Sequence, residues 1–255
     1  MELQSIRIAG HSVEYRRIGA RVDGAPTIVF LHEGLGSARL WRDFPDRLCR
    51  RAGCAGIVYS RYGNGFSDVL AQGRAVRYMH DEANALAELL DALSIERCTL
   101  FGHSDGASIA LIIAGTQSAR FTSLVLEAPH VFVEPLSVKS IAAIGEVYRN
   151  GDMRARMGRH HADVDRTFFG WNDVWLSSDF VSWNITGCLA PISAPVLCIQ
   201  GAGDEYGTPA QIDAIARGTS GSVDRLILDR CGHSPHRDRG DYVEVSAAAW
   251  LSGLR

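Results

Sequence analysis

Short apolar runs alternate along this chain with stretches in which apolar residues recur every three or four positions. Continuous apolar runs are typical of strands buried on both faces, and they occur at 27–32, 56–60, 98–101, 123–127, 195–200 and 226–228. Helical spacing follows in three stretches, one with Trp41 and Phe44 on one side, one at Tyr78–Leu93 and one at Ala107–Thr116. Strands alternating with helices predict an α/β fold built on a mostly parallel sheet with helices on both faces.

The first part of the chain differs from this pattern. Apolar and polar residues alternate between Ile6 and Ile18, with a turn signal at Ala9-Gly10-His11, which predicts an antiparallel hairpin. The hairpin and the six apolar runs together give a sheet of eight strands.

The segment 131–194 interrupts the alternation of strands and helices. It has no convincing strand, it has helical patterns such as Ile141–Tyr148, and it concentrates large aromatic residues. We therefore expect a core domain formed by 1–130 and 195–255, with 131–194 inserted as a helical cap. A chain of 255 residues with 46% hydrophobic content fits one domain with such an insertion.

Charge and cysteine content exclude several classes of function. The formal net charge is −3 and Lys139 is the only lysine, so no basic patch for nucleic acid is expected. No run of eighteen apolar residues and no signal-peptide pattern occur, which predicts a cytoplasmic protein without a membrane partner. The six cysteines lack Cys-x-x-Cys spacing, so neither disulfides nor a zinc cluster are predicted. The chain is expected to be a monomer or a homodimer.

The candidate nucleophile lies in Gly102-His103-Ser104-Asp105-Gly106, between a predicted strand and a predicted helix. Glycines on both sides of a serine allow a tight turn that projects the hydroxyl from the sheet edge. A serine flanked by spaced glycines is also common in ordinary turns, so the five residues require support from the rest of the chain.

That support comes from a resemblance to the α/β-hydrolase superfamily over nearly the whole chain. The segments that carry it occur in the family's order: His32-Glu33-Gly34-Leu35-Gly36, Arg61-Tyr62-Gly63-Asn64-Gly65-Phe66-Ser67-Asp68, the Ser104 turn, the helical insertion, Gly201-Ala202-Gly203-Asp204 and Cys231-Gly232-His233. The resemblance implies the α/β-hydrolase fold, with the cap inserted after the sixth strand. It also implies a nucleophile, acid and base in the order Ser104, Asp204, His233. Glu205 and Glu127 are the alternative acids.

The chemistry explains why these residue types are needed. A protonated serine is a poor nucleophile, so His233 would accept its proton and pass it to the leaving group. Asp204 would hold the His233 ring in one tautomer. The family stabilises the oxyanion with two backbone N–H groups, which fall here on Asp105 and on Gly34, or on Leu35 in a shifted register. Glu33 departs from the pattern because the family commonly has glycine at that place.

The remaining histidines do not predict a metal site. His103 is next to the nucleophile and is expected to point away from it with a structural role. His160-His161, and His233 with His236, have suggestive spacing but lack the carboxylate or cysteine partners of a divalent site in the sequence. We therefore predict neither a metal nor any other cofactor.

The substrate is predicted only by class. An apolar, partly aromatic pocket for a small molecule is expected from the cap. The candidate contact residues are Glu33, Leu35, Trp41, Phe168, Trp171 and Trp175. Arg154, Arg156 and Arg159 would meet a carboxylate or a phosphate-bearing group such as coenzyme A, or form a solvated helix face.

The leading hypothesis is a serine hydrolase that cleaves a small carboxylic ester or thioester through an acyl-enzyme. The alternatives are a carbon–carbon bond hydrolase of aromatic ring-cleavage products, a lactonase and a cofactor-free haloperoxidase. A small-molecule receptor or pseudoenzyme on the same fold represents a different class.

Overall fold

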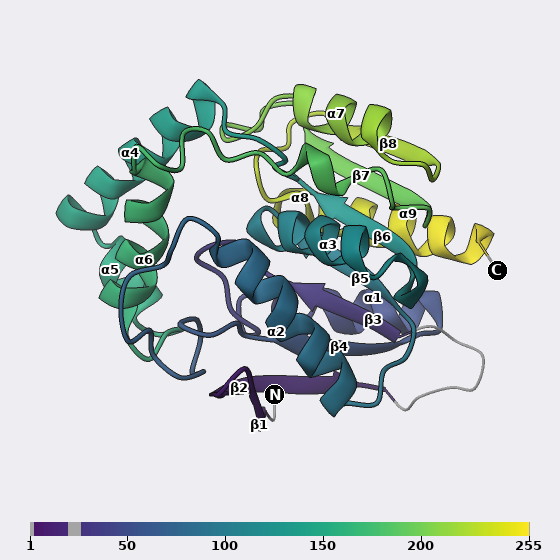
Figure 1. The fold of residues 1–255 in the computed structure, drawn as a ribbon, viewed down its shortest axis with the longest axis horizontal. Helices are drawn as coiled ribbons and strands as arrows, with labels where there is room; N and C mark the ends of the chain where they lie inside the picture. Colours follow the sequence, from purple (N-terminus) through teal and green to yellow (C-terminus); the bar gives the residue numbers. More distant parts are fainter. Residues whose placement is uncertain (1–2, 20–26, 255) are drawn as a thin grey trace.

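The computed structural model describes residues 3–19 and 27–254, and its eight strands form one sheet in the order β1-β2-β4-β3-β5-β6-β7-β8 (Figure 1). The strands are β1 (Gln4–Ile8), β2 (His11–Ile18), β3 (Thr27–Leu31), β4 (Ala55–Tyr59), β5 (Cys98–His103), β6 (Phe121–Glu127), β7 (Val196–Gly201) and β8 (Val223–Leu228). β1 and β2 form the predicted antiparallel hairpin, and β2 joins β4 antiparallel. Strands β3 to β8 are mutually parallel, which confirms the predicted sheet.

Helices cover both faces of the sheet, as predicted. They are α1 (Phe44–Ala52), α2 (Tyr78–Ala92), α3 (Asp105–Thr116), α4 (Pro135–Asn150), α5 (Met153–Met157), α6 (Val164–Leu176), α7 (Ala210–Gly218), α8 (Pro235–Asp238) and α9 (Gly240–Gly253), with short 3₁₀ turns η1 (Ser118–Arg120) and η2 (Thr186–Cys188). α1 packs against α9, and α2 packs against α3 (Figure 1).

The two faces of the sheet bury separate cores. Successive side chains of a strand point to opposite faces, so Val29 and Leu31 of β3 join the core under α2 and α3. Ile28 and Phe30 join the core under α1 and α9. All four are fully buried. Burial on both faces explains why the parallel strands are continuous apolar runs in the sequence.

Helices α4, α5 and α6 all fall between β6 and β7 in the chain and gather beside one end of the sheet (Figure 1). Their aromatic side chains pack closely, as in the stacked pair Tyr148 and Phe168, whose ring centroids are 3.7 Å apart. The segment is therefore helical, while its exact limits at 131 and 194 stay a prediction. We call α4 to α6 and their connections the cap below.

One predicted helix begins later than expected. Trp41 precedes α1, which starts at Phe44 with Pro45 in its first turn. Gly53 ends the helix in the left-handed conformation. None of the helices in the described part of the chain has the length and apolar character needed to span a bilayer.

Candidate active site

Ser104 lies in a strained turn between β5 and α3. Its backbone has φ 53° and ψ −117°, a conformation that is unusual for a residue other than glycine. The flanking glycines are required by close backbone contacts: a Cβ on Gly102 would lie 2.5 Å from the Gly106 carbonyl oxygen, and one on Gly106 would lie 2.1 Å from the Leu31 oxygen. The turn therefore needs glycine on both sides, which is the pattern found in the sequence.

Three side chains from three strand ends form a hydrogen-bonded chain. The Oγ of Ser104 is 2.9 Å from Nε2 of His233, and Nδ1 of His233 is 2.8 Å from Oδ1 of Asp204. Ser104 follows β5, Asp204 follows β7 and His233 follows β8. The carboxyl ends of parallel strands meet at one edge of the sheet, where ligands bind in open α/β folds.

Electrostatics favour a charged aspartate beside a basic histidine. Burial alone would raise the pKa of Asp204, but the hydrogen bond and charge of His233 outweigh it and lower that pKa to about 2. Oδ1 of Asp204 also accepts the backbone N–H groups of Tyr206, at 2.9 Å, and Gly207, at 3.2 Å. Burial would lower the pKa of His233, yet the hydrogen bond to Asp204 raises it above 6.5. The arrangement can stabilise an imidazolium formed on His233.

Neither alternative acid makes a hydrogen bond with the ring of His233. Glu127, at the end of β6, is 2.6 Å from Nδ1 of His236. Glu205 accepts the backbone N–H of His233 at 3.3 Å. Among the three candidate carboxylates, only Asp204 meets the imidazole of His233.

The loop after β3 presents Gly34 near Ser104. The backbone N–H groups of Gly34 and Asp105 make no hydrogen bond within residues 3–19 and 27–254. Asp105 is the first residue of α3, where backbone N–H groups have no partner inside the helix. Both groups are therefore free to donate to a substrate oxygen.

Two side chains after β4 fix the shape of that loop. Arg61 donates to the carbonyl oxygens of His32 and Glu33, the latter at 3.0 Å. Asn64 donates to the carbonyls of Gly34, at 3.0 Å, and Gly36, at 3.1 Å. Neither Arg61 nor Asn64 was assigned a role from the sequence, although both belong to a segment that carries the family resemblance.

A second network holds the carboxylate of Asp105 beneath the site. The Tyr78 hydroxyl donates to Asp105 at 2.5 Å, and the Trp175 indole N–H donates to the Tyr78 oxygen at 3.0 Å. Burial raises the pKa of Asp105. The network ties α2, α3 and the cap helix α6 together next to Ser104. Tyr78 was missed because in the sequence it is one more apolar position of a helix.

A cavity of about 460 Å³ opens over Ser104 between the core and the cap. The predicted contact residues Glu33, Leu35, Trp171 and Trp175 line it, together with Ser104 and His233. The Trp171 indole lies so close to Gly34 that a Cβ there would be 2.1 Å from its Nε1. The cap thus covers the loop that presents the Gly34 N–H.

Two predicted contact residues, Trp41 and Phe168, do not line this cavity. Trp41 is 2% exposed and packs edge-on against Phe30 and Phe101 in the core under α1. Phe168 is fully buried in the cap, stacked on Tyr148. Their size made them candidates in the sequence, but large aromatic residues also provide the main packing area of a core.

His130 and Tyr206 also line the cavity and were not singled out in the sequence. The His130 ring centroid is 5.6 Å from that of His233, and burial lowers the pKa of His130 to about 3. The Tyr206 ring centroid is 4.6 Å from that of His233. His130 is therefore a neutral wall of the cavity rather than a second base.

Glu33 is charged and paired at the mouth of the cavity. Burial would raise its pKa, but Arg237, at 3.0 Å, and His103 hold that pKa well below the usual value. Oε2 of Glu33 is 3.5 Å from Nδ1 of His103. Nε2 of His103 is 2.7 Å from the carbonyl oxygen of His233. His103 therefore points away from the Ser104 hydroxyl and links two loops of the site.

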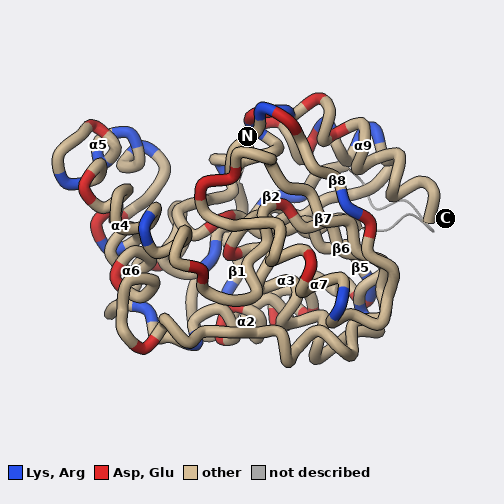
Figure 2. Tube along the Cα trace, turned by 90° about the horizontal axis from the view of Figure 1, so that it is seen from above, with Lys and Arg blue, Asp and Glu red and all other residues tan. Residues whose placement is uncertain are grey.

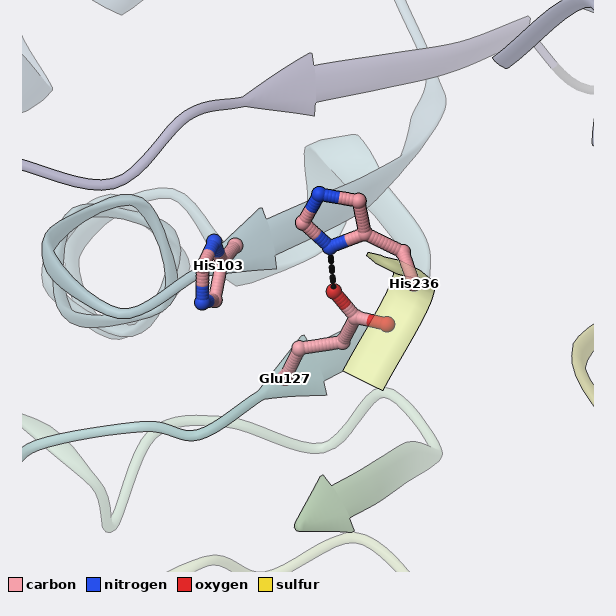
Figure 3. Close-up of side chains that lie close together, drawn as sticks. All are labelled: His103, Glu127 and His236. Carbon is pink, nitrogen blue, oxygen red and sulfur yellow. Dashed lines mark hydrogen bonds and ion pairs between the residues drawn. The ribbon is translucent and has the colours of Figure 1, made fainter. Parts of the chain in front are cut away.

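Glu127, His103 and His236 form a compact buried group whose possible ligand atoms all lie within 4.8 Å of one another (Figure 3). Glu127 and His236 are already hydrogen-bonded to each other. The nitrogens of His103 face Glu33 and His233 instead. One carboxylate oxygen of Glu127, Nδ1 of His236 and Nε2 of His103 are thus engaged with protein partners, and we assign no metal to this group.

Comparison with known proteins shows the family to which this chain belongs. The sequence model of the alpha/beta hydrolase family matches residues 28–245. A proline iminopeptidase of Lactobacillus helveticus is 23% identical, over 95% of each chain. Among solved structures, VinJ superposes with a TM-score of 0.79 at 21% identity, covering 100% of this chain and 99% of that one. The enol-lactonase of Burkholderia xenovorans LB400 has a TM-score of 0.78 at 18% identity, covering 98% and 100%.

Proposed function

This chain belongs to the α/β-hydrolase family, and from that premise we propose that it is a serine hydrolase cleaving a small carboxylic ester or thioester through an acyl-enzyme. The observation that carries the proposal is the hydrogen-bonded chain from Ser104 Oγ through His233 to Asp204, at 2.9 and 2.8 Å. A hydroxyl next to a base that is itself oriented by a carboxylate is the arrangement of an activated nucleophile.

In the proposed reaction Ser104 Oγ attacks the substrate carbonyl carbon while Nε2 of His233 accepts the hydroxyl proton. The charge that develops on the carbonyl oxygen is stabilised by the N–H groups of Gly34 and Asp105. His233 then gives its proton to the departing alcohol or thiol, which leaves the acyl group on Ser104. A water molecule, deprotonated by His233, releases the acid and regenerates Ser104.

The shape of the cavity supports a small substrate. Its volume of about 460 Å³ is in the range of small-molecule pockets. The cap contributes apolar side chains such as Ile141, Ile144 and Met157, so one wall fits an apolar group. A lactone is a cyclic ester and fits the same mechanism. The carbon–carbon hydrolase, haloperoxidase and receptor alternatives stay open and differ in the outcome of the tests below.

Labelling with a fluorophosphonate tests the nucleophile. We expect one label per chain, mapped by peptide mass spectrometry to Ser104, and a burst of nitrophenol from a short-chain nitrophenyl ester. Ser104→Ala should lose the label, the burst and turnover. Ser178→Ala is the matched control, because Ser178 is an exposed serine in the turn that follows α6.

A protein that binds the ester without label or burst would be a receptor on this fold. A label at another residue would overturn the assignment of Ser104. With the nucleophile established, a panel of esters, acyl thioesters, lactones and ring-cleavage products identifies the bond that is cleaved best.

A further inference from the structure

Arginine side chains gather around the mouth of the Ser104 cavity. His160, in the connection between α5 and α6, lines the cavity, and so do Arg42 and Arg237. Burial and then the charges of Arg159, Arg39, Arg42 and Arg237 lower the pKa of His160. Arginines from three separate parts of the chain therefore lie close enough to His160, at the cavity rim, to lower its pKa.

Many arginines in the described part of the chain pair with neighbouring carboxylates, and some at the rim do not. Acidic and basic segments are interspersed on the cap helices (Figure 2), and Arg154 pairs with Asp165 at 2.6 Å while Arg156 pairs with Asp152 at 2.9 Å. Arg42 and Arg159, in contrast, make no side-chain hydrogen bond or ion pair to any described residue.

Two carboxylates that line the cavity, Glu33 and Glu205, contact residues other than Arg42. Glu33 pairs with Arg237 at 3.0 Å. Glu205 accepts the N–H of His233 at 3.3 Å. The Arg42 side chain lines the cavity and forms an ion pair with none of the described carboxylates, so its guanidinium is available to a ligand.

A second cavity, a surface groove, adjoins the Ser104 cavity at this rim. A groove of about 780 Å³ beside α1, α8 and α9 shares Leu40, Arg42 and Arg237 with the Ser104 cavity. The acidic side chains of the groove have partners: Asp43 and Asp241 pair with Arg47, and Asp238 accepts the N–H of Gly232 at 2.8 Å. A substrate longer than the Ser104 cavity would cross the arginine rim to enter this groove.

We propose that Arg42, with the unpaired Arg159 adding to the field, forms a subsite for a negatively charged group of the substrate. This inference rests on the proposed hydrolase function and narrows its substrate class to esters or thioesters that carry a carboxylate or a phosphate. The apolar cap wall takes the uncharged end of the substrate. Guanidinium groups suit carboxylate and phosphate oxygens because they donate two parallel N–H bonds.

A matched pair of substrates tests the subsite by turnover. We compare kcat/KM for a nitrophenyl ester with a terminal carboxylate on its acyl chain against its methyl-ended analogue of equal length. Arg42→Gln should lower the ratio of charged to neutral kcat/KM by about fivefold, the size of an exposed ion pair. Arg42→Glu should lower it further, and high salt should shrink both effects.

Arg7→Gln is the control, because Arg7 is an exposed arginine on β1 at the far edge of the sheet. Its ratio should equal that of the unmodified protein. The same ratio in all three variants would overturn the subsite.

A binding measurement separates failure of the subsite from failure of the hydrolase function. In the Ser104→Ala protein, which cannot form an acyl-enzyme, calorimetric titration uses glutarate and coenzyme A as probes. Binding of glutarate alone identifies a carboxylate site, and binding of coenzyme A alone identifies a phosphate site. Either should weaken about fivefold when Arg42→Gln is added. Absence of binding by both probes, or binding that does not depend on Arg42, overturns the proposal even if Ser104 proves to be the nucleophile.

Discussion

Two histidine–carboxylate pairs lie at the carboxyl end of the same sheet, and they have opposite electrostatics. His233 is 2.8 Å from Asp204 and faces the cavity, whereas His236 is 2.6 Å from Glu127 in the interior (Figure 3). In the first pair the pKa of Asp204 is lowered to about 2 and that of His233 is raised. In the second pair burial raises the pKa of Glu127 to about 8 and lowers that of His236 to about 3.

The difference comes from the surroundings of each carboxylate rather than from the distance within the pair. Asp204 accepts two backbone N–H groups besides the imidazole, and these bonds stabilise its charge. Oε1 of Glu127 is buried and has no hydrogen-bond partner among the described residues. A carboxyl that lacks such donors is easier to bury with its proton. Two pairs of similar geometry therefore differ in charge: the charged pair suits the proton transfer that we propose at Ser104, and the buried pair packs as neutral groups.

Removing one carboxylate from each pair should have the largest and most unequal effect. Asp204→Asn should lower kcat for ester hydrolysis by about 10⁴-fold, because an asparagine no longer stabilises the imidazolium or holds the required tautomer. Glu127→Gln should leave kcat nearly unchanged, since an amide resembles the protonated carboxyl. Steady-state kinetics of both variants with one nitrophenyl ester measure this contrast. Loss of activity in Glu127→Gln alone would show that Glu127 is the acid.

The neutral pair predicts a pH dependence of stability. At pH 5.5 the folded protein holds one proton on Glu127 and the unfolded chain holds one on His236, so the two states bind equal numbers of protons. Between pH 6.5 and about 8 the unfolded histidine has lost its proton while folded Glu127 still holds one. Stability from this pair therefore falls as pH rises through that window, by about 2 kcal/mol in total.

Glu127→Gln should remove this loss because glutamine does not titrate. Denaturant unfolding of both proteins at pH 5.5 and pH 8 gives the comparison. The free energy of unfolding of the variant, relative to the unmodified protein, should be about 3 kcal/mol more favourable at pH 8 than at pH 5.5, because the unmodified protein loses stability over this range and the variant gains some as the unfolded His236 loses its proton. An equal difference at both pH values would mean that Glu127 is charged in the folded protein.

The charged pair of Asp204 and His233 predicts an effect on the pH profile of activity, which is smaller than the effect of the neutral pair on stability. His233 must be neutral to accept the proton of Ser104, so kcat/KM should rise with pH through a midpoint above 6.5, where its pKa is held by Asp204. Titration of the His233 ring by nuclear magnetic resonance should move to lower pH in Asp204→Asn and stay in place in Glu127→Gln. A midpoint below 6.5 in the unmodified protein would contradict the pairing.

The sequence by itself determined the architecture. Continuous apolar runs predicted the parallel strands because those strands are buried on both faces, and period-two alternation predicted the β1–β2 hairpin. Gly102 and Gly106 mark the turn at Ser104 because any side chain there would collide with backbone atoms. Such requirements are local, so they are visible in the residues themselves.

Only the tertiary structure decided which side chains meet. Asp204, Glu205 and Glu127 are chemically similar and all lie at or just after strand ends, and of the three the packing brings only Asp204 to the ring of His233. The same holds for Trp41, which fills the core, and Trp171, which covers Gly34 at the cavity. Large aromatic residues have the same pattern in a sequence whichever role they take. Their contacts, and the unpaired charge of Arg42 at the cavity rim, depend on segments that lie far apart in the chain and come together only on folding.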